Sequence, residues 1–330
     1  MHLWLISVAI AVAGLMLAGA IYEQCSRRLN AKRFPAPGLI FDVNGHKLHL
    51  LAKGTGMPAV IIEQGAGGPA LAWSSIQDKL AAFTCVCLYD RAGYGWSEHI
   101  PGPRSLEDRV CDWHALLTAA KIPAPYVLVG HSYGGFLVRL FARNYPDEVA
   151  GLVLVDSPHE GTYFQPEVLS FYSKMTWMMG AMKILALVGL PRLLTRLLNK
   201  PDPAVSLQLS EQINAAMVRN EYFSAAGDDI ASLRRATQWL TKAEAFAPLG
   251  DLPITVITHG QPFPGPFAVL DKGWREGQDR LAALSTNSVL LVAEKSNHMI
   301  HADEPDLVIG AIREVVERAR QQALALRQLT

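Results

Sequence analysis

The hydrophobic and polar residues of this chain follow three successive patterns. Residues 3–22 form an apolar run without a charged side chain. From residue 39 to residue 158, short apolar runs alternate with helix-like stretches, and this alternation returns after residue 248. The stretch between them, residues 159–248, is helical in character and rich in methionine. The pattern predicts an N-terminal helix, a folded body and a helical insertion within that body.

The N-terminal apolar run has the length of a membrane-spanning helix. Twenty helical residues extend for about 30 Å, the thickness of the hydrocarbon core of a bilayer. A basic cluster with Arg27, Arg28, Lys32 and Arg33 follows the run. We therefore expect a single membrane helix over residues 1–24 and a linker over residues 25–38.

The charges that flank the apolar run bear on its orientation. Only His2 precedes the run, so the positive-inside rule predicts that the globular part is cytoplasmic. A secretory signal carries positive charge before its apolar part, and that charge is missing here. Cleavage after Ala18-Gly19-Ala20, which would give a periplasmic or secreted domain, is the alternative.

The first part of the body, residues 39–158, has the pattern of an α/β domain. Two short runs, residues 39–43 and 46–51, flank Asn44-Gly45, a strong signal for a β-hairpin. Four further strands are predicted at residues 58–63, 84–89, 126–130 and 151–155, with helices at residues 71–83 and 106–120 and after Ser132. Strands that alternate with helices predict a parallel sheet covered on both faces.

The insertion, residues 159–248, is expected to form a cap over the carboxyl ends of the strands. Its apolar segment 182–190 is too short to span a bilayer and fits either the core of the cap or a surface that faces lipid. The α/β pattern resumes over residues 249–330, with strands at 254–258 and 288–292 and helices at 271–284 and from Pro305 onward.

Composition excludes several classes of function. The 330 residues include 30 Lys and Arg against 30 Asp and Glu, so the chain offers no excess positive charge for a nucleic acid. Four cysteines do not make a disulfide scaffold in a chain of this length. The zinc-binding patterns Cys-x-x-Cys and His-Glu-x-x-His are absent, and we expect neither a metal nor a cofactor.

The most informative chemistry follows the strand that ends near residue 130. There the chain reads Gly130-His131-Ser132-Tyr133-Gly134 and continues directly into a helix. A sharp strand-to-helix turn holds a serine hydroxyl out where a base can reach it, and its crowded backbone requires glycine on both sides. Ser132 is therefore the predicted nucleophile.

A serine nucleophile needs a base and an acid that orients this base. His298 follows the last strand and precedes the final helix, which favours it over His301 as the base. Asp156 directly follows the strand 151–155 and is the predicted acid. Asp271 is the alternative, because the later strand ends in Thr258-His259-Gly260-Gln261, which carries no carboxylate.

Negative charge on the substrate oxygen requires hydrogen-bond donors that are already in place. The backbone N–H of Tyr133, at the start of a helix, is one candidate. The glycine-rich loop Gln64-Gly65-Ala66-Gly67-Gly68 follows another strand and supplies the second, for which we select the N–H of Ala66.

Four segments together resemble the alpha/beta hydrolase family over about residues 39–320. They are Gln64-Gly65-Ala66-Gly67-Gly68, the stretch from Tyr89 to Ser97, Gly130-His131-Ser132-Tyr133-Gly134, and Asn297-His298. The resemblance implies an eight-stranded, mostly parallel sheet with a cap inserted after the sixth strand. It also implies the catalytic order Ser132, Asp156, His298 and an oxyanion hole made by Ala66 and Tyr133.

This chain departs from the family pattern at two positions. Gln64 stands where the family usually has a histidine, and the acid follows the sixth strand rather than the seventh. The first departure should alter the hydrogen bonds of the oxyanion loop. The second leaves the choice between Asp156 and Asp271 open.

These features predict a serine hydrolase that cleaves a small, lipophilic carboxylic ester at a membrane. Amide or peptide hydrolysis and a catalytically inert, membrane-tethered binding module are alternatives. A third is a dinucleotide-dependent oxidoreductase, because residues 65–70 and Asp90 imitate a dinucleotide-binding fingerprint. Haloalkane dehalogenase and epoxide hydrolase chemistry are disfavoured, because family members with these activities carry an aspartate at the position of Ser132.

Overall fold

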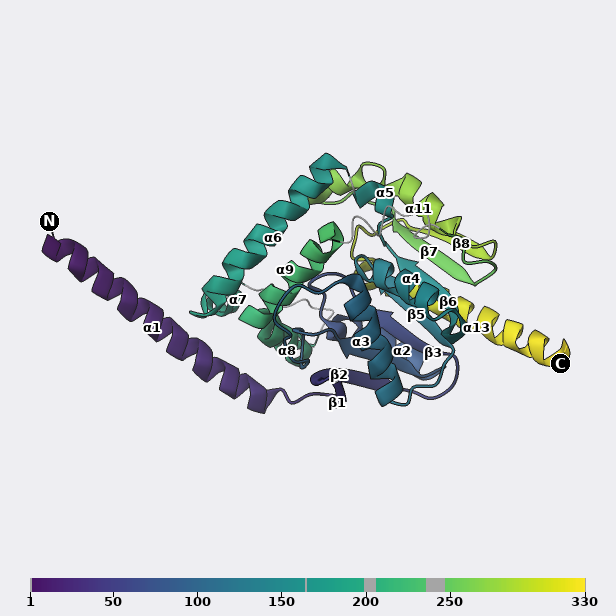
Figure 1. The fold of residues 1–330 in the computed structure, drawn as a ribbon, viewed down its shortest axis with the longest axis horizontal. Coiled ribbons are helices and arrows are strands. Elements are labelled where there is room, and N and C mark those ends of the chain that lie inside the picture. Colours follow the sequence, from purple (N-terminus) through teal and green to yellow (C-terminus); the bar gives the residue numbers. More distant parts are fainter. Residues whose placement is uncertain (1, 164, 199–205, 236–246, 330) are drawn as a thin grey trace.

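The computed structural model describes residues 2–163, 165–198, 206–235 and 247–329. Figure 1 shows a central sheet, helices on both of its faces, and one long N-terminal helix that projects away from the body. The strands are β1 (Leu39–Val43), β2 (His46–Lys53), β3 (Ala59–Glu63), β4 (Val86–Asp90), β5 (Tyr126–His131), β6 (Val149–Val155), β7 (Ile254–His259) and β8 (Ser288–Ala293). The helices of the body are α2 (Ser74–Ala81), α3 (Leu106–Ala119), α4 (Gly134–Asn144), α11 (Trp274–Ala282), α12 (Ile300–Asp303) and α13 (Pro305–Leu329).

The predicted eight-stranded, mostly parallel sheet is confirmed. Its strand order is β1-β2-β4-β3-β5-β6-β7-β8, and β2 pairs antiparallel with both β1 and β4 while the remaining pairs are parallel. The predicted hairpin joins β1 to β2, and both turn residues, Asn44 (φ 53°) and Gly45 (φ 81°), have positive φ. A two-residue hairpin turn of type I′ requires this conformation, which explains the Asn-Gly pair.

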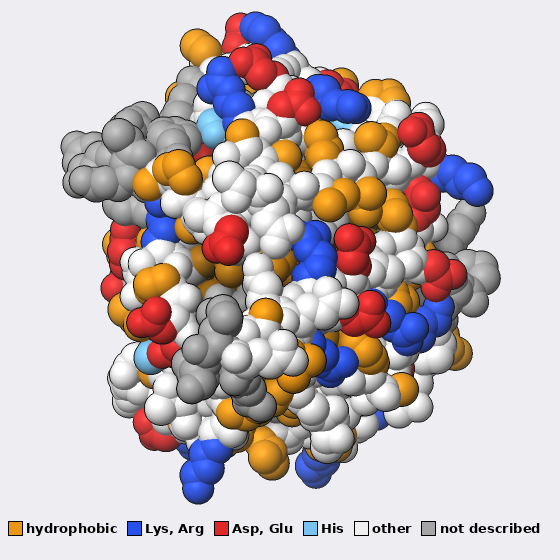
Figure 2. All heavy atoms as spheres, turned by 90° about the vertical axis from the view of Figure 1, so that its right-hand side faces the viewer, with side chains coloured by type: hydrophobic (Ala, Val, Ile, Leu, Met, Phe, Trp, Pro, Cys, Tyr) orange, Lys and Arg blue, Asp and Glu red, His pale blue; other side chains and the backbone are white. Residues whose placement is uncertain are grey.

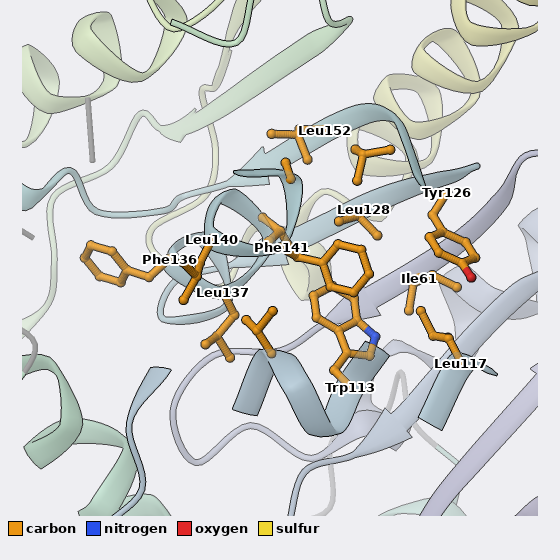
Figure 3. Packing of buried hydrophobic residues seen from close by; sticks show 14 of the residues in the cluster. Ile61, Trp113, Leu117, Tyr126, Leu128, Phe136, Leu137, Leu140, Phe141 and Leu152 are labelled. Atoms are coloured by element: carbon orange, nitrogen blue, oxygen red, sulfur yellow. The ribbon is translucent and has the colours of Figure 1, made fainter. Parts of the chain in front are cut away.

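Helices bury both faces of the sheet. On one face α3, α4 and α11 pack against the strands, and Trp113 of α3 contacts Phe141 of α4 at a ring-centroid distance of 4.6 Å (Figure 3). On the other face α2 and α13 bury apolar residues such as Ile76 and Ile312. Strands β3, β4 and β5 are buried along their whole length, as expected for parallel strands that are covered on both sides.

The insertion between β6 and β7 is helical in its described part. It contains α5 (Glu160–Tyr163), α6 (Pro166–Ala186), α7 (Leu190–Leu198), α8 (Leu207–Met217) and α9 (Asn220–Arg235). Helices α6 and α9 pack against each other, and α7 turns by 97° from the direction of α6. Hydrogen bonds from Tyr222 to Gly67 O (2.9 Å) and between Tyr133 and Ser232 (3.0 Å) attach α9 to the loops that follow β3 and β5.

The N-terminal helix α1 (His2–Arg33) is longer than the sequence pattern suggested. It continues through the basic cluster, so the connection to β1 shortens from the expected residues 25–38 to residues 34–38. Among the described helices, α1 is by itself long and apolar enough to cross a membrane. Most of its first twenty residues are exposed and do not touch the body.

The end of the molecule opposite to α1 has an ordinary polar surface. Figure 2 looks onto this end and shows Lys and Arg side chains interspersed with Asp and Glu, with apolar side chains scattered between them. Such mixing is typical of a surface in contact with water.

Candidate active site

Ser132 lies in a sharp turn between β5 and α4. Its φ of 51° is rare for a residue with a side chain, and its backbone N–H donates to Val155 O at 3.1 Å. A Cβ on Gly130 would lie 2.7 Å from Val138 Cγ2, and one on Gly134 would lie 2.3 Å from Glu63 O. Both glycines are therefore required by close packing, and the strained turn leaves the serine half-buried at the carboxyl edge of the sheet.

Asp156 and His298 meet at the same edge. Asp156 follows β6, is completely buried and has a φ of 44°. His298 lies in the loop after β8, and its Nδ1–H donates to Asp156 Oδ2 at 2.7 Å. This bond leaves Nε2 of His298 as the nitrogen that can exchange a proton with a substrate or a nucleophile. Between described residues, the structure contains no hydrogen bond from Ser132 to His298.

The carboxylate of Asp156 stays ionised although it is buried. Burial alone would raise its pKa, but hydrogen bonds from His259 and His298, together with their charge, outweigh burial and lower the pKa to about 2. Trp274 Nε1–H adds a further hydrogen bond to Oδ1 at 3.0 Å. Each oxygen therefore has at least one donor, which makes burial of this charge tolerable.

His259, at the end of β7, is a site residue that was not predicted from the sequence. Its Nδ1–H donates to Asp156 Oδ1 at 2.9 Å, and its Nε2 lies 3.3 Å from Asp271 Oδ1. Asp271 thus contacts His259 rather than His298. The missed signal was a polar side chain at the end of a parallel strand, where the carboxyl ends of neighbouring strands converge.

The two carboxylates beside His259 predict a pH-dependent contribution to stability. Burial lowers the pKa of His259, but Asp156 and Asp271 outweigh burial and raise it above 6.5. A raised pKa means that this contribution is complete below about pH 6.5 and is lost as the pH rises through the folded-state pKa. We expect the free energy of unfolding of the wild type to exceed that of His259→Gln by more at pH 6 than at pH 9. Urea unfolding at both pH values measures this difference, and an equal difference at both would contradict the expectation.

The two other nearby histidines serve different contacts. His301 stacks on Trp73 at a ring-centroid distance of 4.3 Å, and burial together with the charge of His298 lowers its pKa to about 4. His131 Nε2–H donates to the backbone oxygen of His298 at 3.0 Å and so supports the loop that carries His298. Of the two histidines considered as the base, the structure puts His298 beside Asp156.

The backbone N–H groups of the loop after β3 are partly bonded within the protein. Gly67 N–H donates to Tyr94 Oη (3.1 Å) and Gly68 N–H donates to Gly65 O (3.1 Å). In the described part of the chain, the backbone N–H groups of Ala66 and Tyr133 have no hydrogen-bond acceptor. Both N–H groups can therefore donate to a ligand oxygen at this edge of the sheet.

Gln64, which replaces the usual histidine of the family, supports this loop through a hydrogen bond to β4. Its Nε2–H donates to Tyr89 O at 3.2 Å, and its side chain is buried. Arg91 donates to Gln64 O and Gly65 O, both at 2.8 Å. In this chain, the side chains of Gln64 and Arg91 therefore support the loop.

Arg91 also belongs to a buried network of charges. Its guanidinium contacts Glu63 and donates to Asp229 of α9 at 2.8 Å. Asp229 further accepts from Tyr94 Oη (2.6 Å) and Arg109 Nε (3.0 Å). Burial raises the pKa of Glu63 to about 7 in spite of the Arg91 charge. The network joins the sheet, the loop after β3 and the insertion.

The described residues contain no group of three or more His, Cys, Asp and Glu side chains that could hold a metal ion. The carboxylate of Asp90, considered above for a dinucleotide, is buried and accepts from His49 Nδ1 (2.8 Å) and Trp96 N (3.2 Å). Both donors bind Oδ2, and burial keeps the carboxylate away from the ribose that it would have to bind.

Comparison with known proteins shows which family and which solved structures this chain is similar to. The model of a family described as the alpha/beta hydrolase family matches residues 60–311. The uncharacterized protein YqjL of Bacillus subtilis is 27% identical over 293 residues, which cover 87% of this chain and 95% of that protein. A thermophilic esterase from Thermogutta terrifontis superimposes with a TM-score of 0.60 at 21% identity, covering 85% of this chain and 98% of the esterase. The epoxide hydrolase CorEH superimposes with a TM-score of 0.64 at 20% identity, covering 84% and 97% of the two chains.

Proposed function

Because this chain belongs to the alpha/beta hydrolase family, we propose that it is a serine hydrolase that cleaves carboxylic esters. The observation that carries the proposal is the strained Ser132 turn beside the ends of β6 and β8, where Asp156 and His298 share a 2.7 Å hydrogen bond. A nucleophile, a base and an orienting acid at one edge are the parts that acyl transfer needs. Hydrogen bonds between nucleophile and base are often long without substrate and tighten in the complex.

The proposed reaction has two steps. His298 Nε2 takes the proton of Ser132 as the hydroxyl oxygen attacks the ester carbonyl, and the carbonyl oxygen accepts hydrogen bonds from the N–H groups of Ala66 and Tyr133. The intermediate collapses, the C–O bond to the alcohol breaks, and His298 returns its proton to the departing alkoxide. Water then attacks the acyl-enzyme with His298 as base again, and the acid leaves as Ser132 recovers its proton.

Asp156 acts in this mechanism through His298. It fixes the tautomer with hydrogen on Nδ1 and stabilises the imidazolium that forms when Nε2 takes a proton. His259 and Trp274 hold Asp156 in turn, so both are positioning residues. Amide hydrolysis would use the same residues and differs only in the leaving group.

The other chemistries considered have less support. Epoxide opening by this fold uses an aspartate nucleophile, and this chain has Ser132 at that position. A dinucleotide would need the carboxylate of Asp90, which is buried and accepts from His49 and Trp96 at Oδ2. An inert binding module would not require a strained serine turn.

We further propose that α1 attaches the enzyme to a membrane and that the substrate is lipophilic. The length and apolar character of α1 support the attachment. The basic residues that follow its apolar part favour a cytoplasmic globular domain. An apolar insertion next to the site suits an ester with a long acyl chain.

Labelling of the purified full-length protein with a fluorophosphonate tests the serine chemistry. We expect covalent modification at Ser132, identified by peptide mass spectrometry, and loss of both labelling and ester hydrolysis by at least about 10³-fold in Ser132→Ala. Ser173→Ala, which removes a part-buried serine of α6, should keep both. Labelling that persists in Ser132→Ala would contradict the proposal.

The acyl-chain preference is tested on the same preparation with p-nitrophenyl esters of increasing length. We expect kcat/KM to rise from short to long acyl chains, because each methylene buried contributes about 0.8 kcal/mol. Activity on short esters alone would contradict the lipophilic substrate while leaving the serine mechanism intact.

A further inference from the structure

The turn between α6 and α7, here called the elbow (residues 184–198), exposes many apolar side chains to the surroundings. Exposed fractions reach 67% for Ile184, 71% for Leu197 and 72% for Leu198, and Trp177 on α6 is 78% exposed. Further exposed apolar residues are Leu185, Leu187, Leu193 and Leu194. A concentration of this kind marks a surface that another apolar body covers.

The elbow and its flanks carry positive charge without negative charge. Residues 168–201 include Lys174, Lys183, Arg192, Arg196 and Lys200 but no Asp or Glu. Lys and Arg beside exposed leucines and a tryptophan are typical of helices that lie at the surface of an anionic membrane.

Direct contacts attach the elbow to α1 at the end of its apolar run. A Cβ on Gly19 would lie 2.5 Å from Val188 O, so the two backbones touch. Glu23 accepts from Arg192 Nε (2.7 Å) and Nη2 (2.8 Å), and both side chains are buried. Arg196 donates to the hydroxyl of Tyr22 at 3.2 Å. The elbow is thus held at residues 19–23 of α1.

This attachment sets the height of the elbow relative to a bilayer. Beyond the elbow, residues 3–18 of α1 continue for about 24 Å without a charge. Figure 1 shows α6 running across the direction of α1, on the side of the body from which α1 projects. If α1 spans a bilayer, α6 lies along its surface and the elbow lies at the boundary between head groups and acyl chains.

A groove beside the elbow has the chemistry of a site for anionic head groups. It lies between α1, α8 and the loop after β4, has a volume of about 560 Å³, and is lined by Arg27, Arg28, Arg192 and Arg219 among others. Arg27 already pairs with Glu221 and Arg192 with Glu23, so Arg28 and Arg219 supply the positive charge of the groove. Arg28 is exposed, and its guanidinium can bind a phosphate with two hydrogen bonds. The opposite end of the molecule mixes both charges instead (Figure 2).

From these contacts we infer that the elbow and the outer side of α6 dock onto an anionic lipid bilayer, with the arginine groove at the level of the phosphates. The inference rests on the proposed attachment of α1 to a membrane and adds a second, peripheral contact through the insertion. It follows that the insertion is held at the lipid surface, so a lipophilic ester can reach the site from the bilayer. Continuity with α1 and the excess of positive charge select lipid over a second copy of this chain.

Quenching of Trp177 by brominated lipids tests the docking. The full-length protein with Trp4→Phe is reconstituted into phosphatidylglycerol-containing vesicles with plain or brominated acyl chains. The difference in fluorescence between Trp4→Phe and Trp4→Phe/Trp177→Phe isolates Trp177. We expect brominated lipid to reduce this difference about twofold, as for an apolar face at the acyl boundary. An unchanged difference overturns the docking.

Two further comparisons separate the causes of failure. Quenching of Trp4, measured as wild type against Trp4→Phe, reports α1 alone. If Trp4 is quenched and Trp177 is not, the docking of the elbow is overturned while the membrane attachment of α1 stands. If neither tryptophan is quenched, the docking and the attachment are both overturned. Leu197→Asp should reduce Trp177 quenching, while Leu324→Asp, an exposed leucine of α13 near the C-terminus, should not. Equal effects of the two variants, or Trp177 shielded by self-association, would also overturn the docking.

Discussion

Replacing Asp156 with asparagine is expected to lower kcat for ester hydrolysis by about 10⁴-fold. The side chain is isosteric, so its contacts with Trp274 and the backbone of His259 can persist. The amide cannot supply the negative charge that balances the His298 imidazolium, and an amide NH₂ turned toward His298 would favour the wrong tautomer. Steady-state hydrolysis of a p-nitrophenyl ester measures the loss, and circular dichroism verifies that the variant is folded.

Asp271→Asn is the matched control for this prediction. Asp271 contacts Nε2 of His259 and is about a third exposed. Its link to His298 therefore passes through both His259 and Asp156. We expect kcat to fall by less than about tenfold, because Asp271 contacts neither the proposed nucleophile nor the proposed base. If Asp271→Asn lost as much activity as Asp156→Asn, the assignment of the acid to Asp156 would be wrong.

Replacing Arg91 with methionine is expected to lower the free energy of unfolding by about 3–5 kcal/mol. Methionine keeps much of the volume but removes the cation from between Glu63 and Asp229, two completely buried carboxylates. Leaving a buried carboxylate without its cation costs more free energy than the lost attraction alone, because no water molecule replaces the missing donor. Urea unfolding of the two proteins measures the difference.

Lys79→Met is the matched control on the surface. Lys79 pairs with Asp306 at 2.8 Å, but the two side chains are 55% and 87% exposed. An exposed pair contributes at most about 1 kcal/mol. Equal losses in Arg91→Met and Lys79→Met would show that the Arg91 network does not stabilise the fold.

The Arg91 network has a consequence beyond stability. It connects the loop that carries Ala66 to α9 of the insertion through Asp229 and Tyr94. The position of the proposed oxyanion donors therefore depends on how the insertion packs. A sequence change in α9 can reach the site without any direct contact with substrate.

Local rules explain why much of the fold could be predicted. The Asn44-Gly45 turn and the Gly130-to-Gly134 turn depend on sterics within a few residues, so their sequence identifies them. The alternation of strands and helices depends equally on short-range periodicity. The exact end of α1 could not be predicted, because its last nine residues are mostly polar and their helical state depends on contacts such as Arg27 with Glu221.

By itself, the sequence determined where a serine lies on a strained turn and that an apolar helix precedes an α/β body, because both follow from neighbouring residues. Only the tertiary structure decided that His298 rather than His301 bonds to Asp156, that His259 stands between Asp156 and Asp271, and that the elbow rests on α1. The bonds of Asp156 with His259 and His298, and of Glu23 with Arg192, join residues that are 103 to 169 positions apart. The order of strands in the sheet and the packing of the insertion set such distances, and no local periodicity encodes them.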